Sequence, residues 1–134
     1  MIHTLKADKY IQAASRQLLQ QCLPKLPADA LNNVQLALAE ALQNIVRHGY
    51  RFKDNQTISL GIKTEGEHLR IEILDHAPPC QPATFLNQAL TPSEAGGMGI
   101  SIIKKLTQHF SITPLANGNV TLLVFNIGCY APTH

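Results

Sequence analysis

Residues 40–50 read EALQNIVRHGY, and this stretch does most to decide the fold. It closes a run of alanines, leucines and valines whose spacing predicts a helix over residues 29–48. Glu40, Asn44 and His48 follow one another at intervals of four residues. Because an α-helix turns by about 100° per residue, these three side chains lie on one stripe. A stripe of this kind is also typical of the solvated face of an ordinary amphipathic helix.

The rest of the chain predicts a helical layer on a sheet. Apolar spacing predicts further helices over residues 9–23 and about 98–109. Alternation predicts strands over residues 57–63 and 68–74, with a hairpin turn between them. The remaining predicted strands cover residues 2–7, 110–114 and 120–126, the last after a turn at Asn117-Gly118-Asn119. We therefore predict an α+β two-layer sandwich, with about three helices on one face of a mixed, largely antiparallel sheet.

Composition limits the class of protein. The 134 residues are 45% apolar and 15% charged, which is typical of a single globular domain spanning residues 1–134. A formal charge of +2 is too small to indicate binding to nucleic acid or to an acidic membrane surface. No apolar run reaches the length of a membrane span, and no signal peptide is visible. Three widely spaced cysteines without a CxxC pair indicate a reducing, cytoplasmic location.

Chemistry is first suggested by the stripe itself. Glu40 lies among alanines and leucines, where a buried charge is costly unless it has a use. A carboxylate in that position can act as a general base toward a hydroxyl group or water. Asn44 offers an amide oxygen suited to a hard cation such as Mg²⁺. Arg47 lies close enough in sequence to reach a terminal phosphate group.

Two later motifs extend this interpretation. Asp75 ends the apolar strand of IEILDHAPP (71–79), where a carboxylate can accept a hydrogen bond from an adenine amino group, although an aspartate before Pro-Pro is also a common turn initiator. GGMGIS (96–101) opens a helix, so its backbone N–H groups can approach phosphate, although a flexible loop before a helix has the same composition. The intervening residues 76–95 show no clear periodicity beyond a short helix near 85–90, and loops of this length are usually functional or mobile.

Together the three motifs resemble a known superfamily. The order E-x-x-x-N-x-x-x-H-G/A-Y, then D-x-x-P-P, then GGMG-I/L-x-x-I is similar to that of the GHKL (Bergerat-fold, histidine-kinase-like) ATPases. Within that superfamily the chain most resembles the bacterial anti-sigma-factor serine/threonine protein kinases. The resemblance covers roughly residues 34–124. It implies the Bergerat fold, with an ATP lid over about residues 79–95.

The resemblance also implies a role for individual residues. Glu40 would be the catalytic base, Asn44 the Mg²⁺ ligand and Asp75 the group that recognises the adenine amino group. Thr121 matches a family threonine that lies beside this aspartate. The full set implied to bind nucleotide is Asn44, Arg47, Asp75, Ala77, Pro79, Gly97, Met98, Gly99, Ile100, Ser101 and Thr121.

The chain departs from the family pattern at three positions. Ala77 stands where the family often has glycine, Cys80 where phenylalanine is common, and Ala95 where an arginine often precedes the glycine pair. Ala77 is a small change that we expect the site to tolerate. Arg47 can replace the missing arginine at the phosphate end. None of these changes removes Glu40 or Asn44, so we expect a catalytically competent protein.

The expected function is that of a cytoplasmic kinase that uses ATP and Mg²⁺. The resemblance implies transfer of the γ-phosphoryl group to a serine or threonine of a STAS-type anti-sigma-factor antagonist. Phosphorylation would then control a sigma factor or another effector protein, and through it transcription. The helix over residues 9–23 is a possible homodimer interface.

Two other functions stay open at this point. The first is a non-catalytic module of the same fold that binds a nucleotide, or none, and sequesters a partner protein; Cys80 and Ala95 favour it. The second is the catalytic domain of a histidine kinase, for which we expect a phosphoacceptor domain that does not fit before residue 30. Larger members of the superfamily, such as topoisomerase and mismatch-repair ATPases, need further domains.

Overall fold

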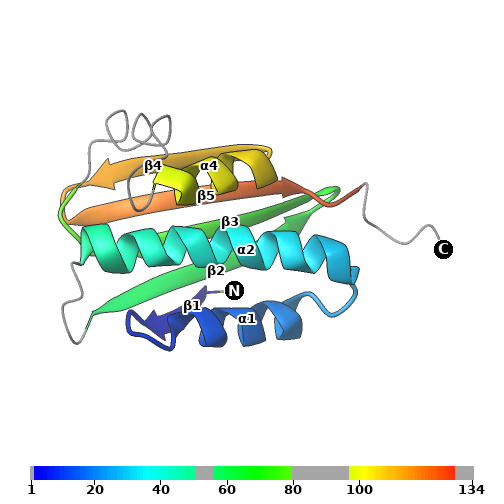
Figure 1. Ribbon diagram of the computed structural model, residues 1–134, viewed down its shortest axis with the longest axis horizontal. Helices are drawn as coiled ribbons and strands as arrows, with labels where there is room; N and C mark the ends of the chain where they lie inside the picture. The colour runs from blue at the N-terminus through cyan, green and yellow to red at the C-terminus, as the bar shows by residue number, and fades with distance from the viewer. Residues whose placement is uncertain (1, 51–55, 80–96, 129–134) are drawn as a thin grey trace.

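The computed structural model describes residues 2–50, 56–79 and 97–128, and these form a sheet covered on one face by helices (Figure 1). The described strands run in the order β1-β2-β3-β5-β4. Each pair of neighbouring strands is antiparallel, so the predicted two-layer sandwich is confirmed while the prediction of a mixed sheet is wrong for these residues. The elements in chain order are β1 (Ile2–Lys6), α1 (Ile11–Cys22), α2 (Ala28–Asn44), η1 (Ile45–Gly49), β2 (Thr57–Glu65), β3 (His68–Asp75), α4 (Gly97–Leu106), β4 (His109–Leu115) and β5 (Gly118–Asn126).

The core lies between α2 and the inner face of the three central strands. Side chains that alternate along β2, β3 and β5 point inward, because successive residues of a strand face opposite sides of a sheet. Leu38 and Leu42 of α2 meet them and are wholly buried. Burial of each such side chain is worth about 1.5–3 kcal/mol. The inward residues with no exposed surface are Ile58, Leu60, Leu69, Ile71, Ile73 and Leu123. The core thus fixes α2 across the middle of the sheet, between α1 and α4 (Figure 1).

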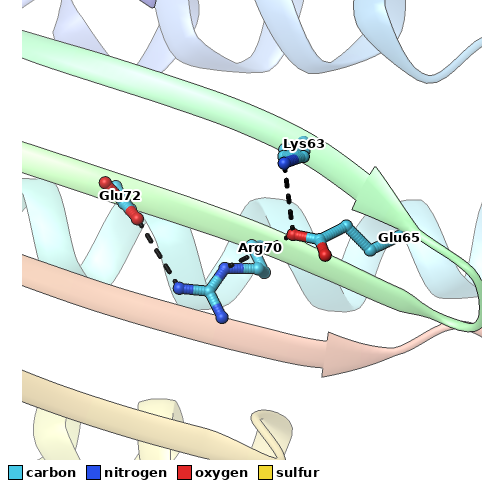
Figure 2. Close-up of polar contacts among 4 residues, drawn as sticks. All are labelled: Lys63, Glu65, Arg70 and Glu72. Carbon is cyan, nitrogen blue, oxygen red and sulfur yellow. Dashed lines mark ion pairs between the residues drawn. The ribbon is translucent and has the colours of Figure 1, made fainter.

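The outer face of the β2–β3 hairpin carries charged side chains in place of a helix. Figure 2 shows Lys63 and Arg70 beside two glutamates, with the helices behind the strands. Lys63 Nζ lies 3.6 Å from Glu65 Oε1, and Arg70 contacts Glu65 at 3.9 Å and Glu72 at 3.6 Å. These groups are exposed, so each pair contributes only about 0–1 kcal/mol. The hairpin turn itself is fixed by Gly66, whose φ of 58° lies in the region that glycine adopts most readily.

Among the element boundaries that differ from the sequence predictions, three have an identifiable cause or consequence. The α-helical part of α2 ends at Asn44 and the π-helical turn η1 follows, where we predicted a helix continuous to residue 48. Helix α4 ends at Leu106, earlier than predicted, because the Gln108 backbone N–H already donates to the Val124 carbonyl of β5 at 2.7 Å and His109 begins β4. Strand β5 begins at Gly118, which places Asn119 in the sheet and not in the preceding turn.

Other predictions concern segments that the structure does not describe. The short helix near residues 85–90 and the ATP lid up to residue 95 lie outside the described residues, as does Cys80. None of the helices that the structure describes has the length and apolar character needed to cross a membrane.

Candidate functional site

The C-terminal end of α2 carries the two side chains of the predicted stripe for which the sequence suggests chemistry. Glu40 is half-buried, and Asn44, one helical turn later, is 7% exposed. The Nδ2 atom of Asn44 is buried and has no hydrogen-bond partner among the described residues. An unpaired buried amide costs free energy, because it has given up its bonds to water. Such a group indicates a place where a polar ligand supplies the missing partner.

A π-helical turn follows Asn44 directly. The backbone N–H of Tyr50 donates to the Ile45 carbonyl at 2.7 Å, five residues back, which is the spacing of a π-helix. The α-helical spacing that we used to place His48 on the stripe therefore ends at Asn44. Arg47 lies within this turn and is exposed. Single π-helical turns are frequent at functional sites.

Asp75 is the last residue of β3 and one of the most buried polar residues described. It is 2% exposed, and its Oδ1 atom accepts a hydrogen bond from the Ala77 backbone N–H at 2.9 Å. This contact is the local turn that the Pro-Pro sequence predicted. Burial raises the pKa of Asp75, while hydrogen bonds from Asn119 and Ala77 and the nearby His76 lower it. Asp75 is thus both a turn former and a buried carboxylate.

Asn119 is the residue that the sequence analysis missed. It lies directly opposite Asp75 across the β3–β5 pair, and its Nδ2 donates to Asp75 Oδ1 at 3.1 Å and to the Pro78 carbonyl at 3.2 Å. Thr121, which we predicted beside Asp75, lies opposite Ile73 and is buried two residues further along the same strand. A signal was available, because residues 119, 121, 123 and 125 alternate onto the inner face and only the last two are apolar.

Tyr50 joins the end of η1 to the strands. It is 3% exposed; its hydroxyl donates to the Thr57 carbonyl at 2.7 Å and accepts from the His76 backbone N–H at 2.7 Å. Burial and the charge of Asp75 raise the pKa of Tyr50, against the opposing effect of the His76 N–H. The end of α2 and the residue after Asp75 are therefore held at a fixed separation.

The glycine motif lies at the same end of the molecule. Helix α4 begins at Gly97, and its N-terminus lies toward the end of the sheet where η1 begins and where β5 starts (Figure 1). Gly97 and Gly99 fall in its first turn, where free backbone N–H groups favour an anion. Ile100 is 2% exposed and anchors this turn in the core, whereas Ser101 is exposed. Carboxylate, amide and helix N-terminus thus gather from elements distant in the sequence.

The fold is shared with known proteins. Residues 6–125 match the histidine kinase-like ATPase domain. The chain is 18% identical to a structure of the RsbU and RsbW domains of Rv1364c from Mycobacterium tuberculosis, with a TM-score of 0.64 over 95% of this chain and 32% of that one. The chain is 14% identical to the histidine kinase domain of the Erythrobacter litoralis EL346 blue-light activated histidine kinase, with a TM-score of 0.60 over 92% of this chain and 65% of that one.

An isolated catalytic domain matches over nearly its full length. The catalytic domain of histidine kinase ThkA is 15% identical, with a TM-score of 0.59 over 95% of this chain and 96% of that one. The chain therefore covers nearly the full length of the ThkA domain but about a third of the length of the mycobacterial chain. No curated protein matches the chain. At these identities the solved structures show the shared fold, and the match over residues 6–125 shows that the chain belongs to the histidine kinase-like ATPase domain family.

Proposed function

We propose that the chain is an ATP-dependent serine/threonine protein kinase of the anti-sigma-factor type, and that it phosphorylates a STAS-type antagonist protein. The observation that carries the proposal is the buried Nδ2 of Asn44, one turn from Glu40, which has no hydrogen-bond partner among the described residues. The sequence motifs and the likeness to a structure that includes an RsbW domain favour a protein kinase with a serine or threonine acceptor over a histidine kinase.

The base of the nucleotide would lie against Asp75. Its Oδ1 already accepts two hydrogen bonds, so the second carboxylate oxygen is the acceptor available to an adenine amino group. Ala77 and Pro79 follow on the same turn and would line the base. Burial of this carboxylate oxygen costs free energy because the oxygen loses its bonds to water, and a donor on the bound base would offset that cost.

The phosphate groups would lie between α2 and α4. Asn44 Nδ2 has no partner among the described residues and can donate to a phosphate oxygen, while the amide oxygen is of the type that Mg²⁺ prefers. Backbone N–H groups of residues 97–100, with the exposed side chains of Ser101 and Arg47, would hold the remaining phosphate oxygens. When bound, Mg²⁺ would neutralise charge that develops on the transferred phosphoryl group.

Glu40 would act on the acceptor hydroxyl. The serine or threonine oxygen attacks the γ-phosphorus, the bond to the β–γ bridging oxygen breaks, and ADP leaves with that electron pair. The hydroxyl proton passes to the carboxylate of Glu40. Glu40 is half-buried, so it is positioned by α2 yet open to a partner protein. The chain's own contribution is therefore positioning and electrostatics.

Calorimetric titration with ATP, with and without Mg²⁺, tests the nucleotide site. We expect binding that Mg²⁺ strengthens, and we expect Asn44→Ala to lose this Mg²⁺ dependence. Asn32→Ala, an exposed position on the same helix, is the matched control and should behave as the wild type. Absence of ATP binding at any Mg²⁺ concentration would overturn the proposal and leave a module that sequesters its partner without nucleotide.

Phosphotransfer to a purified STAS-type protein tests the kinase itself. Glu40→Gln should keep ATP affinity within about twofold and lower the transfer rate by about 10²–10⁴-fold, the usual contribution of a general base. Glu72→Gln, an exposed glutamate on the outer face, is the control. A protein that binds ATP but transfers no phosphate to any STAS-type acceptor is the non-catalytic module. Full transfer by Glu40→Gln would remove the base assignment.

A further inference from the structure

We propose that Asn119 is the residue that sets the base specificity of the site, because it holds Asp75 as an oriented hydrogen-bond acceptor that selects adenine over guanine. The proposal rests on the proposed function, since it assumes that a nucleotide base lies against Asp75. Asn119 would act through Asp75 and is therefore a positioning residue.

The geometry fixes the orientation of both side chains. The amide nitrogen of Asn119 lies 3.1 Å from Asp75 Oδ1 and 3.2 Å from the Pro78 carbonyl oxygen, so its two hydrogens have one acceptor each. Two acceptors near the same atom also identify it as the nitrogen of the amide. Asn119 is 5% exposed, which keeps water from competing for these bonds. The amide therefore ties the carboxylate to the carbonyl three residues later.

This contact leaves one carboxylate oxygen for a ligand. Both donors that the structure gives for Asp75, Ala77 N–H and Asn119 Nδ2, lie on Oδ1. Within the described part of the chain, Oδ2 has no donor. An ionised carboxylate oxygen only accepts hydrogen bonds, so it pairs with the amino group of adenine and repels the carbonyl oxygen that guanine has in its place.

Asn119 also opposes the effect of burial. A carboxyl group that is 2% exposed is driven toward its neutral form by desolvation, and hydrogen bonds to the ionised form counteract this. A neutral carboxyl group carries an O–H donor and can pair with the guanine carbonyl. Loss of the Asn119 donor would therefore both free the carboxylate to rotate and allow it to protonate. Either change weakens selection for adenine.

The test compares the affinities of ADP and GDP in the presence of Mg²⁺ by calorimetry. The wild type should prefer ADP. Asn119→Leu keeps the branched shape of the side chain but has no donor, and we expect ADP affinity to fall by about 10–100-fold, as for a lost hydrogen bond to a charged group. GDP affinity should stay the same or rise, so the ADP:GDP ratio falls at least as much. Asn126→Leu, at the exposed opposite end of β5, is the matched control and should keep the wild-type ratio.

The ratio separates a specificity role from a structural one. Equal losses for ADP and GDP in Asn119→Leu would overturn the inference, since a merely loosened site discriminates as before. If Asn119→Leu does not fold, Asn119→Ser decides: one hydroxyl cannot serve both Asp75 and Pro78, so its ratio should also fall, and a ratio within about twofold of the wild type would contradict the inference. A wild type that binds neither nucleotide refutes the proposed function itself, whereas wild-type ADP preference with unchanged variant ratios refutes only the role of Asn119.

Discussion

At the scale of single residues, the site is made of groups that are unfavourable for folding alone. Asp75 is a carboxylate with almost no exposed surface, and Asn44 buries an amide nitrogen without a partner among the described residues. Each costs free energy that an apolar residue of similar size would not. Burial of such groups together at one end of the sheet is what a ligand site requires. It also makes stability and binding respond in opposite directions to substitution.

Asp75→Asn tests this opposition. Burial raises the pKa of Asp75 above its ordinary 3.8, so the folded chain keeps its proton at pH values where the unfolded chain has lost it. The contribution of Asp75 to the free energy of unfolding therefore falls as the pH rises from the ordinary pKa through the raised pKa. Above the raised pKa, the full cost of burying the charged carboxylate remains. Asp75→Asn removes the charge and keeps an Oδ1 acceptor for Ala77 and Asn119.

We expect Asp75→Asn to unfold at a higher urea concentration than the wild type at pH 7, with the difference shrinking toward pH 4 and below. Its ADP affinity should fall by at least about tenfold, because an amide donor replaces an acceptor. Glu72→Gln on the outer face should change neither property by much, because its ion pair is exposed. A less stable Asp75→Asn protein at pH 7 would mean that hydrogen bonds to the carboxylate outweigh its burial.

At the scale of elements, the ends of β3 and β5 must approach very closely for Asp75 and Asn119 to meet. A Cβ atom on Gly118 would lie 2.1 Å from the Asp75 carbonyl oxygen, far closer than a nonbonded carbon and oxygen can approach, so the backbone would have to move. Gly61 in β2 offers a comparison, because its Cβ would lie 3.9 Å from the Glu72 carbonyl, in ordinary contact. A comparison of substitutions at Gly118 and Gly61 therefore distinguishes the effect of close strand approach from the general effect of replacing a glycine.

Gly118→Ala should lower the free energy of unfolding by about 1–3 kcal/mol or more, as expected for a core overpacked against backbone. The same displacement should weaken ADP binding, because it moves Asn119 relative to Asp75. Gly61→Ala should change stability by less than about 0.5 kcal/mol and leave binding intact. Urea denaturation and calorimetry of both variants measure this. Equal effects at the two positions would show that strand approach at Gly118 is not what positions the site.

The elements also show where sequence patterns succeed. The period of apolar residues predicted α1, α2, α4, β2 and β3, because burial against one core sets that period. It failed at helix ends, where single hydrogen bonds differ from the α-helical pattern: Tyr50 N–H bonds to Ile45 in η1, and Gln108 N–H after α4 bonds to Val124 of the sheet. Asn119 was missed for a related reason, since Asn-Gly-Asn is typical of a turn, whereas β5 begins two residues earlier than predicted, at Gly118.

At the scale of the whole molecule, the site depends on contacts that no local pattern contains. Asn44 and Asp75 were selected in the sequence by their place in motifs, and residue spacing alone could not show that α2, β3, β5 and α4 bring them to one end of the sheet (Figure 1). That convergence follows from the strand order, which places β5 beside β3, and from the packing of α2 and α4 against each other. In the unfolded chain these four elements are not held together, so the site exists only in the folded chain.

A ligand at this end should therefore stabilise the whole domain. A ligand that binds only the folded chain raises the free energy of unfolding by about 2.7 kcal/mol when present at about a hundred times its dissociation constant. We expect Mg²⁺-ADP at that excess to raise the wild-type guanidinium midpoint accordingly, and ADP with a chelator at the same concentration to raise it less. Asn44→Ala should show the same, smaller rise with and without Mg²⁺, because this variant lacks the proposed protein ligand of the metal. GDP at equal concentration controls for a general effect of phosphate.

A midpoint that Mg²⁺-ADP leaves unmoved would mean that the four elements do not form one ligand site. Loss of the Mg²⁺ effect in Asn44→Ala alone would place the metal at the end of α2.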